Sequence, residues 1–194
     1  LTPDTMIMRL STLERWPLMG WRGILMGVTL LIVWRYLLTD NVEREWKSLV
    51  SVPGLVVIFS FGINSITFTL GIQETSVMVV LTALATMPIF AAILSSILMS
   101  ESQGFLGWVT ILFAMLGVYI VVGDGANAVG QPDGSTVLGA IYGGITAFGL
   151  ALTFTVARKY KELGIIPAAA LGSLFSGLVG FYFSSFDSVF TAPI

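Results

Sequence analysis

Residues 50–99 have the sequence VSVPGLVVIFSFGINSITFTLGIQETSVMVVLTALATMPIFAAILSSILM, in which two long apolar stretches are separated by the residues QET. A helix that crosses a bilayer needs about 20 mostly apolar residues, because the hydrocarbon core is about 30 Å thick and each residue rises about 1.5 Å. The stretches at 50–72 and 76–99 both meet this requirement. They predict two membrane-spanning helices joined by a short turn.

The composition of the whole chain also indicates a lipid environment. Of its 194 residues 56% are hydrophobic and 10% are charged, and the mean hydropathy is +0.93; a surface that faces water carries more charge. The absence of Cys and His excludes disulfide frameworks, thiolate catalysis, the usual zinc sites and haem held by His. The formal net charge of -2 gives no basic excess for binding nucleic acid. We expect a lipid bilayer as partner, no nucleic acid and no cofactor, while carboxylate-only metal sites stay open.

Six stretches in all are long and apolar enough to cross a bilayer. They are residues 16–38, 50–72, 76–99, 104–123, 136–157 and 165–185. They lack the alternation of barrel strands, and the pairs Gly23/Gly27 and Gly139/Gly143 have the Gly-x-x-x-Gly spacing that lets helices approach closely in lipid. The sequence therefore predicts an all-α, polytopic membrane protein. The short connections after the second and third stretches predict antiparallel neighbours in a compact hairpin stack.

Basic residues in the connections predict the orientation of the chain. The first and fifth connections carry six of them, and the opposite side carries three. The six are Arg35, Arg44, Lys47, Arg158, Lys159 and Lys161, and the three are Arg9, Arg15 and Arg22. Because short basic loops stay in the cytoplasm, we expect an integral protein of the cell or inner membrane with its first, third and fifth connections in the cytoplasm.

Polar side chains recur at helical spacing within three of the predicted spans. Steps of four, three and four residues place them on one face of a helix. One such face holds Ser60, Asn64, Thr67 and Gly71, a second holds Tyr142, Thr146, Gly149 and Thr153, and Thr82 and Thr86 are four residues apart. A polar solute would find hydrogen-bonding groups on these faces. The candidate pathway residues are Ser60, Asn64, Thr67, Thr82, Thr86, Tyr142, Thr146 and Thr153.

Packing is the alternative role for each of these residues. Thr and Ser in membrane helices also bond the carbonyl four residues earlier or hold neighbouring helices together. The amide of Asn64 cannot stay bare in hydrocarbon, so it faces either a wet cavity or a partner helix. Tyr142 lies near the start of its span and is also a candidate interfacial ring.

Pro88 and three charged residues complete the candidates. Pro88 has no N–H to bond the carbonyl of Leu84, which predicts a bend and a candidate hinge, with static packing as the alternative. We expect Glu74 and Glu101 to be solvated loop acids at opposite membrane edges. Arg22 is expected to anchor its helix at the level of the lipid headgroups rather than to bind an anionic solute.

The order of these motifs resembles the EamA repeat of the drug/metabolite transporter superfamily. Gly71, Thr75 and Ser76 close one helix, Pro88 lies within the next, Glu101 ends it, and Gly117-Val118 come late in the helix after it. Upstream, RWPLMGWRGILMG resembles the second helix of that repeat. Downstream, GAIYGGITAFGLALTFTVARKY resembles the first helix of a second repeat.

This resemblance implies a ten-helix transporter made of two inverted repeats, of which six helices are present. Residues 1–123 would be most of the first repeat without its first helix, 124–135 an outer linker, and 136–194 the start of the second repeat. Pro17/Pro167 and Gly27/Gly177 recur at an offset of 150 residues as a weak internal echo.

The expected function is that of a secondary transporter, not an enzyme, which moves a small polar or zwitterionic metabolite by alternating access. A non-transporting scaffold or assembly protein, packed through its small-residue faces, is the alternative. A second copy of the chain, in a homodimer, is a further candidate partner.

Overall fold

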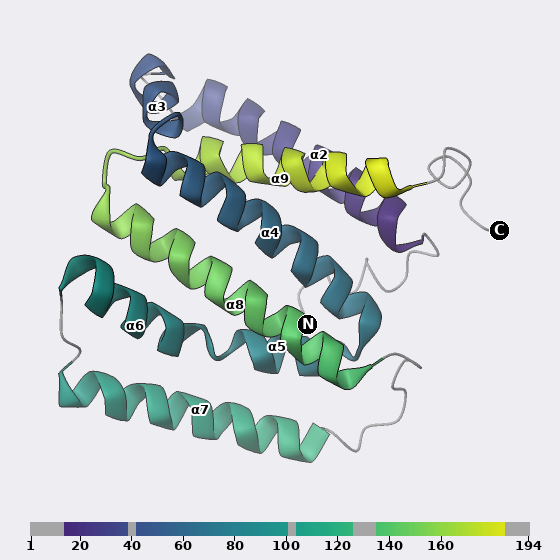
Figure 1. Ribbon diagram of the computed structural model, residues 1–194, viewed down its shortest axis with the longest axis vertical. Coiled ribbons are helices and arrows are strands. Elements are labelled where there is room, and N and C mark those ends of the chain that lie inside the picture. The colour runs from purple at the N-terminus through teal and green to yellow at the C-terminus, as the bar shows by residue number, and fades with distance from the viewer. Residues whose placement is uncertain (1–13, 39–41, 101–103, 126–134, 185–194) are drawn as a thin grey trace.

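The computed structural model is an array of helices that run side by side, without a strand in the part of the chain that it describes (Figure 1). It describes residues 14–38, 42–100, 104–125 and 135–184, and for residues 38, 114 and 117–125 the backbone alone. The elements are α2 (Arg15–Val33), the π-helical turn η1 (Trp34–Leu38), α3 (Val42–Leu49), α4 (Val52–Glu74), α5 (Val77–Leu84), α6 (Met87–Met99), α7 (Phe105–Gly125), α8 (Thr136–Lys159) and α9 (Ile165–Phe183).

Five helical stretches among the described residues are long and apolar enough to cross a membrane. They are Arg15–Leu37, Val52–Glu74, Val77–Met99, Thr136–Lys159 and Ile165–Phe183. These confirm five of the six predicted spans. Over the remaining one, residues 104–123, α7 forms a helix of 21 residues, and its passage through the bilayer stays a prediction. The chain is an all-α, polytopic membrane protein.

Serine side chains cap the first turns of three of these helices. The hydroxyl oxygen of Ser51 accepts the N–H of Gly54 at 3.4 Å, and that of Ser76 accepts the N–H of Val79 at the same distance. Ser135 does the same for α8. An N-cap side chain satisfies a backbone donor that the helix leaves unpaired. These residues therefore fix where each span begins.

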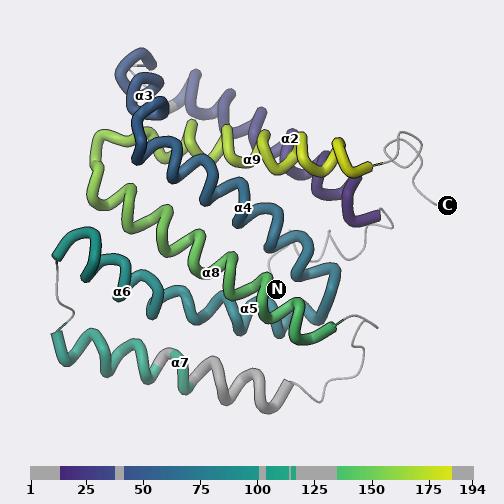
Figure 2. Tube along the Cα trace, in the orientation of Figure 1, coloured from purple at the N-terminus to yellow at the C-terminus, as the bar shows by residue number. Residues whose placement is uncertain are grey.

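The third span is broken in the middle. α5 ends at Leu84 and α6 begins at Met87, with Pro88 in the first turn of α6 (Figure 2). The N–H of Thr86 donates to the carbonyl of Ala83 at 3.1 Å, a tightened turn that stops the α-helical ladder. The predicted bend is confirmed, and it is sharper than expected because the span consists of two helices.

The predicted hairpin stack is half right: α7 lies beside the α5–α6 pair, but α8 lies between that pair and α4 (Figure 1). Glycines on α8 allow this close insertion. A Cβ added to Gly143 would lie 2.6 Å from the Cβ of Ala83 and 2.9 Å from the carbonyl oxygen of Val80, and one added to Gly139 would overlap the side chain of Thr75. The glycine face of α8 therefore packs against α5, although α5 directly follows α4 in the sequence.

α2 and α9 form the closest pair of antiparallel helices. The prediction that Gly23 and Gly27 serve close packing is confirmed: Cβ atoms added there would lie 2.5 Å from Cα of Gly177 and 2.6 Å from Cγ of Leu174. Backbone therefore touches backbone along this seam, which gives the van der Waals contact that drives helix association in lipid.

The first, third and fifth connections meet at one end of the bundle, as the sequence predicts. Arg44 forms an ion pair with Glu162 at 2.5 Å, and Lys159 donates to the carbonyl of Leu98 at 2.6 Å. The hydrogen bond from Arg44 to Glu162, followed by the charge of that carboxylate, raises the pKa of Arg44. Both side chains of this pair are exposed.

The first connection contains α3, a helix that the sequence reading treated as a loop. Its charges follow helical spacing, with Lys47 bonded to Glu43 at 2.7 Å. The indole N–H of Trp34 donates to the carboxylate of Glu45, and Ser48 accepts the N–H of Gly164 at 3.4 Å. α3 therefore ties η1 to the connection between α8 and α9.

Candidate functional site: a cavity between α2, α4, α5 and α8

The two polar faces predicted on α4 and α8 pack against each other. A Cβ added to Gly71 would lie 3.2 Å from Cβ of Tyr142, and one added to Gly149 would lie 3.4 Å from Cβ of Asn64. The positions pair in antiparallel order along the two helices. The helical spacing thus identified the face that each helix uses, and the tertiary structure turns these faces toward one another.

Thr67 and Thr146 join the two faces at their centre. Their hydroxyl oxygens are 2.8 Å apart, and Thr146 also donates to the carbonyl of Tyr142 at 2.8 Å. Thr67 lies 3.0 Å from the carbonyl oxygen of Ile63. Both hydroxyls therefore have hydrogen-bond partners within the protein, and they join α4 to α8.

A cavity of about 210 Å³ opens beside this seam. Its polar wall is formed by Arg22 from α2, Asn64 and Ser65 from α4, and Thr146 from α8, and Leu84 closes it from the end of α5. The rest of the lining is apolar or aromatic. The cavity is smaller than the pockets of about 300 Å³ and above that hold drug-sized ligands, so it suits a small solute.

Asn64, Ser65 and Thr146 are the buried polar residues of this wall, and Asn64 differs from the other two in its hydrogen bonding. It is 7% exposed, and its Oδ1 has no hydrogen-bond partner among the described residues. A bare amide oxygen in a buried site costs free energy that a donor would recover. Asn64 lies at the wall of the cavity and also packs against Gly149 of α8, so its role in a solute pathway stays a prediction.

The expectation that Arg22 anchors its helix at the level of the lipid headgroups stays a prediction. Its side chain lines the cavity, its Nη1 lies 3.4 Å from Oγ of Ser65, and its guanidinium carbon is 5.8 Å from the ring centroid of Phe68. The glycine seam with α9 sets this direction, because Arg22 and Met26 lie about a third of a turn away from Gly20, Gly23 and Gly27. Arg22 therefore faces α4 rather than the edge of the bundle.

Six of the eight predicted pathway residues are not among the residues that line the cavity: Ser60, Thr67, Thr82, Thr86, Tyr142 and Thr153. Thr82 and Thr86 donate to the carbonyls of Met78 and Ala83, each at 2.6 Å, as threonines do in a packed helix. The carbonyl oxygen of Ser60 lies on the α4–α8 seam beside Gly149. Thr153 is 1% exposed, and its Oγ1 has no hydrogen-bond partner among the described residues. Their part in a solute pathway stays a prediction.

A second cavity, of about 430 Å³, lies on the other side of the helix break. Pro88 and Ser95 of α6, Thr110 of α7 and Arg158 of α8 are among its lining residues. Leu84, the last residue of α5, lines the first cavity, and Pro88 lines the second. The break at Ala85–Thr86 therefore lies between the two.

Residues 5–123 match the model of the EamA-like transporter family. The chain belongs to this family. No curated protein and no solved structure matches it. An EamA-like chain is a membrane transporter of the drug/metabolite transporter superfamily, whose members are transporters rather than enzymes, and it works on a small-molecule solute from within a lipid bilayer. The matched region covers α2 to α7, and α8 completes the cavity from outside it.

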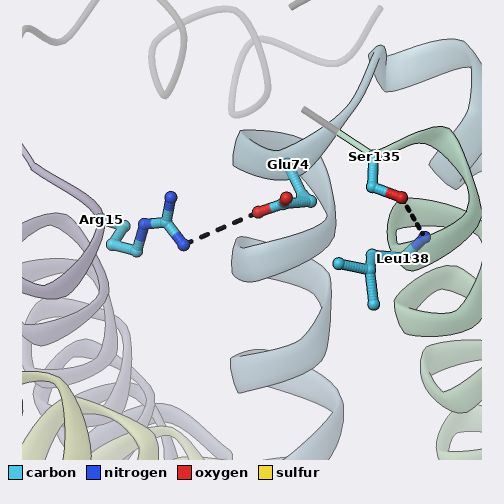
Figure 3. A network of polar contacts seen from close by, with 4 residues as sticks. All are labelled: Arg15, Glu74, Ser135 and Leu138. Carbon is cyan, nitrogen blue, oxygen red and sulfur yellow. Dashed lines mark hydrogen bonds and ion pairs between the residues drawn. The ribbon is translucent and has the colours of Figure 1, made fainter. Parts of the chain in front are cut away.

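The end of this EamA-like bundle that lies opposite the basic connections carries a further correction. Glu74, expected to be a solvated loop acid, lies in the last turn of α4 with its side chain 20% exposed, and its Oε2 is 3.6 Å from Nη1 of Arg15 at the start of α2 (Figure 3). Beside it, the hydroxyl of Ser135 accepts the N–H of Leu138 at 3.3 Å. The ion pair joins the first residue of α2 to the last residue of α4, because these two helix ends lie at the same end of the bundle. Glu101 lies outside the described residues.

Two polar residues of the EamA-like cavity were absent from the sequence-based set. Arg22 was assigned to the headgroups because a long stem can reach them from within a span. Ser65 was missed because it lies about 100° around the helix from Asn64; its hydroxyl is 2.9 Å from that of Ser176 on α9. A signal for Arg22 was present, namely a permanent charge two turns inside an apolar helix, which is costly unless it faces protein or water.

Proposed function

We propose that this chain forms the greater part of a secondary transporter that moves a small polar or zwitterionic metabolite by alternating access, with the cavity at Asn64 and Thr146 as its solute site. The observation that carries the proposal is the cavity itself. It is enclosed by separate helices and has both a charged group and a buried amide in its wall. Such a site between membrane helices is where transporters hold their substrate.

Contacts between α2 and α9 support a two-repeat architecture. An offset of 150 residues relates Gly27 to Gly177 and Gly20 to Ala170. A Cβ on Gly27 would lie 2.9 Å from the carbonyl oxygen of Ala170, and a Cβ on Gly177 would lie 3.1 Å from that of Gly20. Each contact thus maps onto the other when the offset is applied.

The same offset relates Gly23 to Ser173, and these two residues meet each other. A Cβ on Gly23 would lie 2.7 Å from the carbonyl oxygen of Ser173. A residue that contacts its own equivalent lies near a local two-fold axis, which is the relationship expected between inverted repeats. Rocking of the two repeats about this axis would open the cavity first to one side of the membrane and then to the other, with the basic connections in the cytoplasm.

The break in the third span supports a hinge at Pro88. A broken membrane helix can bend at its free carbonyls and expose them to solute. Here the break separates the cavity at Leu84 from the cavity at Pro88, so that tilting α6 relative to α5 would change the passage between them.

Flux measurements test the proposal directly. The complete protein, reconstituted in liposomes, is expected to give saturable uptake or efflux of at least one member of a panel of amino acids, nucleosides and sugars. Asn64→Leu should reduce that flux, whereas Thr29→Val, on the exposed face of α2, should leave it unchanged. Failure to transport any member of the panel, with insertion verified, would overturn the proposal.

Cysteine accessibility separates a transporter from the alternative, a scaffold. The 194 residues contain no Cys, so each variant places a single thiol within them. Two controls set the range of reaction rates with a water-soluble thiol reagent: Glu43→Cys on exposed α3 should react fastest, and Ser173→Cys, which is 0% exposed in the α2–α9 seam, should react slowest. We expect intermediate rates for Asn64→Cys and Tyr142→Cys, far above the rate of Ser173→Cys. If Asn64→Cys and Tyr142→Cys react as slowly as Ser173→Cys, the scaffold is favoured.

A further inference from the structure

We infer that α3 is a clasp, a short helix that holds the connection between α8 and α9 and keeps the basic end of the bundle closed until it detaches. This inference rests on the proposed transport function, because a clasp has a role only if the two repeats move. It names contacts on which that motion would depend and which lie outside both the cavity and the α2–α9 seam. Three kinds of contact made by α3 carry it.

The first contact fixes α3 to the end of the first span. The indole N–H of Trp34 donates to the carboxylate of Glu45, and the rings of Trp34 and Trp46 stack with their centroids 6.5 Å apart. Trp34 is 5% exposed, so little water competes for this bond. It begins the π-helical turn η1, and such turns are frequent at functional sites. α3 is therefore attached to the proposed first repeat.

The second contact joins α3 to the connection between α8 and α9. The hydroxyl of Ser48 accepts the N–H of Gly164 at 3.4 Å, and Arg44 pairs with Glu162 at 2.5 Å. A Cβ atom added to Gly164 would lie 3.0 Å from Oε2 of Glu45, so the glycine lets this carboxylate approach closely. Gly164 is the N-cap residue of α9. α3 therefore holds the residue at which α9 begins.

The third contact is a buried apolar cluster beneath α3. Its members come from α3, α4, α8, the following connection and α9, and they are Leu49, Val57, Val156, Leu163 and Ala168. Leu49, the last residue of α3, is 2% exposed and Val57 is 0% exposed. Val57 lies about one turn before Phe61, which lines the cavity at Asn64. The cluster therefore lies between this cavity and the basic end of the bundle.

The contacts differ in how much they hold. The ion pair of Arg44 and Glu162 is exposed on both sides, and water screens such pairs, so it contributes little. The hydrogen bond of Trp34 and the burial of Leu49 are shielded from water and contribute most. We therefore expect the clasp to be released by removing a donor or an apolar group rather than by removing a charge.

The position of the clasp suits it to respond to rocking of the repeats. Gly23 and Ser173 meet near the proposed two-fold axis. Gly164 precedes Ser173 by nine residues, which is about 13 Å along α9. A rotation about the axis would keep the contact at Gly23 and separate Gly164 from α3. Release of the clasp would then uncover Val57 and, beyond it, the cavity.

Thiol labelling tests whether the clasp closes one end of the bundle. The complete protein is placed in lipid nanodiscs, where a reagent reaches both ends. The reporters are Val57→Cys and Val80→Cys, both at positions 0% exposed and in the apolar clusters of opposite ends. Trp34→Phe removes the N–H donor and keeps an aromatic ring. It should raise the labelling rate of Val57→Cys by about two- to tenfold, the effect of one lost hydrogen bond, and leave Val80→Cys unchanged.

A matched substitution and a second measurement complete this test. Trp108→Phe makes the same change at an exposed position of α7 and should alter neither rate. Spin labels at Lys47→Cys and Lys161→Cys, both exposed, report the separation of α3 from the connection without a buried thiol. One short distance is expected in the parent, and a second, longer one after Trp34→Phe.

Reversible cross-linking tests whether transport needs the clasp to open. Arg44→Cys and Glu162→Cys are joined by a short bifunctional thiol reagent with a reducible link, which replaces the exposed ion pair by a covalent bridge. Flux into liposomes should stop on cross-linking and return on reduction. The control joins Glu43→Cys to Lys47→Cys, a pair within α3 itself, and should leave the flux unchanged.

The outcomes separate the clasp from the transport proposal. Equal effects of Trp34→Phe and Trp108→Phe on Val57→Cys, equal acceleration of both reporters, or an unchanged distance between the spin labels would overturn the clasp. Flux that continues through the cross-linked protein would overturn the clasp and leave the transporter standing. Absence of flux before any cross-linking, with Trp34→Phe still exposing Val57→Cys alone, would overturn the transporter and support α3 as the closing element.

Discussion

Gly23 of α2 lies against Gly177 of α9 so closely that a Cβ atom added to Gly23 would be 2.5 Å from both Cα and N of Gly177. No side chain stands between the two helices at this point, so none can move aside. This contact fixes the rotation of α2, and the rotation of α2 places Arg22 in the cavity. The small-residue seam and the solute site are therefore linked.

Adding a single methyl group to this seam should destabilise the fold. Gly23→Ala is expected to lower the free energy of unfolding by about 1–3 kcal/mol, because backbone atoms have to separate. The measurement is unfolding by SDS in mixed micelles. Gly144→Ala is the matched control, because a Cβ atom at Gly144 would meet nothing within 4 Å. Alanine also has a higher helix propensity than glycine, so this variant should not lose stability. An equal loss for both variants would contradict the packing role of Gly23.

The hydroxyl pair of Thr67 and Thr146 should contribute a small but measurable coupling between α4 and α8. In a double-mutant cycle with Thr→Val at both positions, we expect a coupling of about 0.6 kcal/mol, typical of hydrogen bonds between membrane helices. The control cycle pairs Thr67 with Thr155, whose hydroxyl bonds the carbonyl of Ala151 on its own helix at 2.7 Å. That cycle should show no coupling. A zero value for Thr67 with Thr146 would mean that the bond is absent in lipid.

The ion pair of Arg15 and Glu74 should restrict access to the cavity from the end of the bundle opposite the basic connections. Both side chains are partly exposed, so removing either one is expected to cost less than about 1 kcal/mol of stability. The sharper readout is the rate at which an impermeant thiol reagent, added from that side, reaches Asn64→Cys in the cavity wall. Glu74→Gln and Arg15→Gln should both raise it, and the double exchange Arg15→Glu with Glu74→Arg should restore it. Glu162→Gln, at the opposite end, serves as the control and should leave it unchanged.

Replacement of Pro88 should slow transport without weakening solute binding. Pro88→Ala returns an N–H that can bond the carbonyl of Leu84, which favours one continuous helix over α5 and α6. We expect a lower maximal flux with the same solute affinity, measured in liposomes. Pro53→Ala changes the same residue type in the first turn of α4, where no break exists, and should have little effect. A loss of affinity with unchanged maximal flux would argue against a hinge.

The sequence by itself determined which segments form the long apolar helices, where these turn and which face of three of them carries polar groups, but it did not predict α3. Hydropathy and helical spacing are local properties, because every lipid-exposed residue meets the same apolar solvent and every helix repeats after about 3.6 residues. For the same reason the polar faces through Asn64 and Thr146 and the break before Pro88 could be predicted.

The tertiary structure alone decided which faces meet and which charges become enclosed. Arg22 and Glu74 both looked like residues at the membrane edge, and only the packing of α2 between α9 and α4 turns one into a cavity wall and the other into an ion pair. The insertion of α8 beside α4 was equally hidden in the sequence. In lipid no hydrophobic force pairs particular helices, so the packing of small residues decides which helices become partners. Gly23 and Gly177 are such a pair, far apart in the sequence but in contact in the structure. Their fit exists only between two folded surfaces.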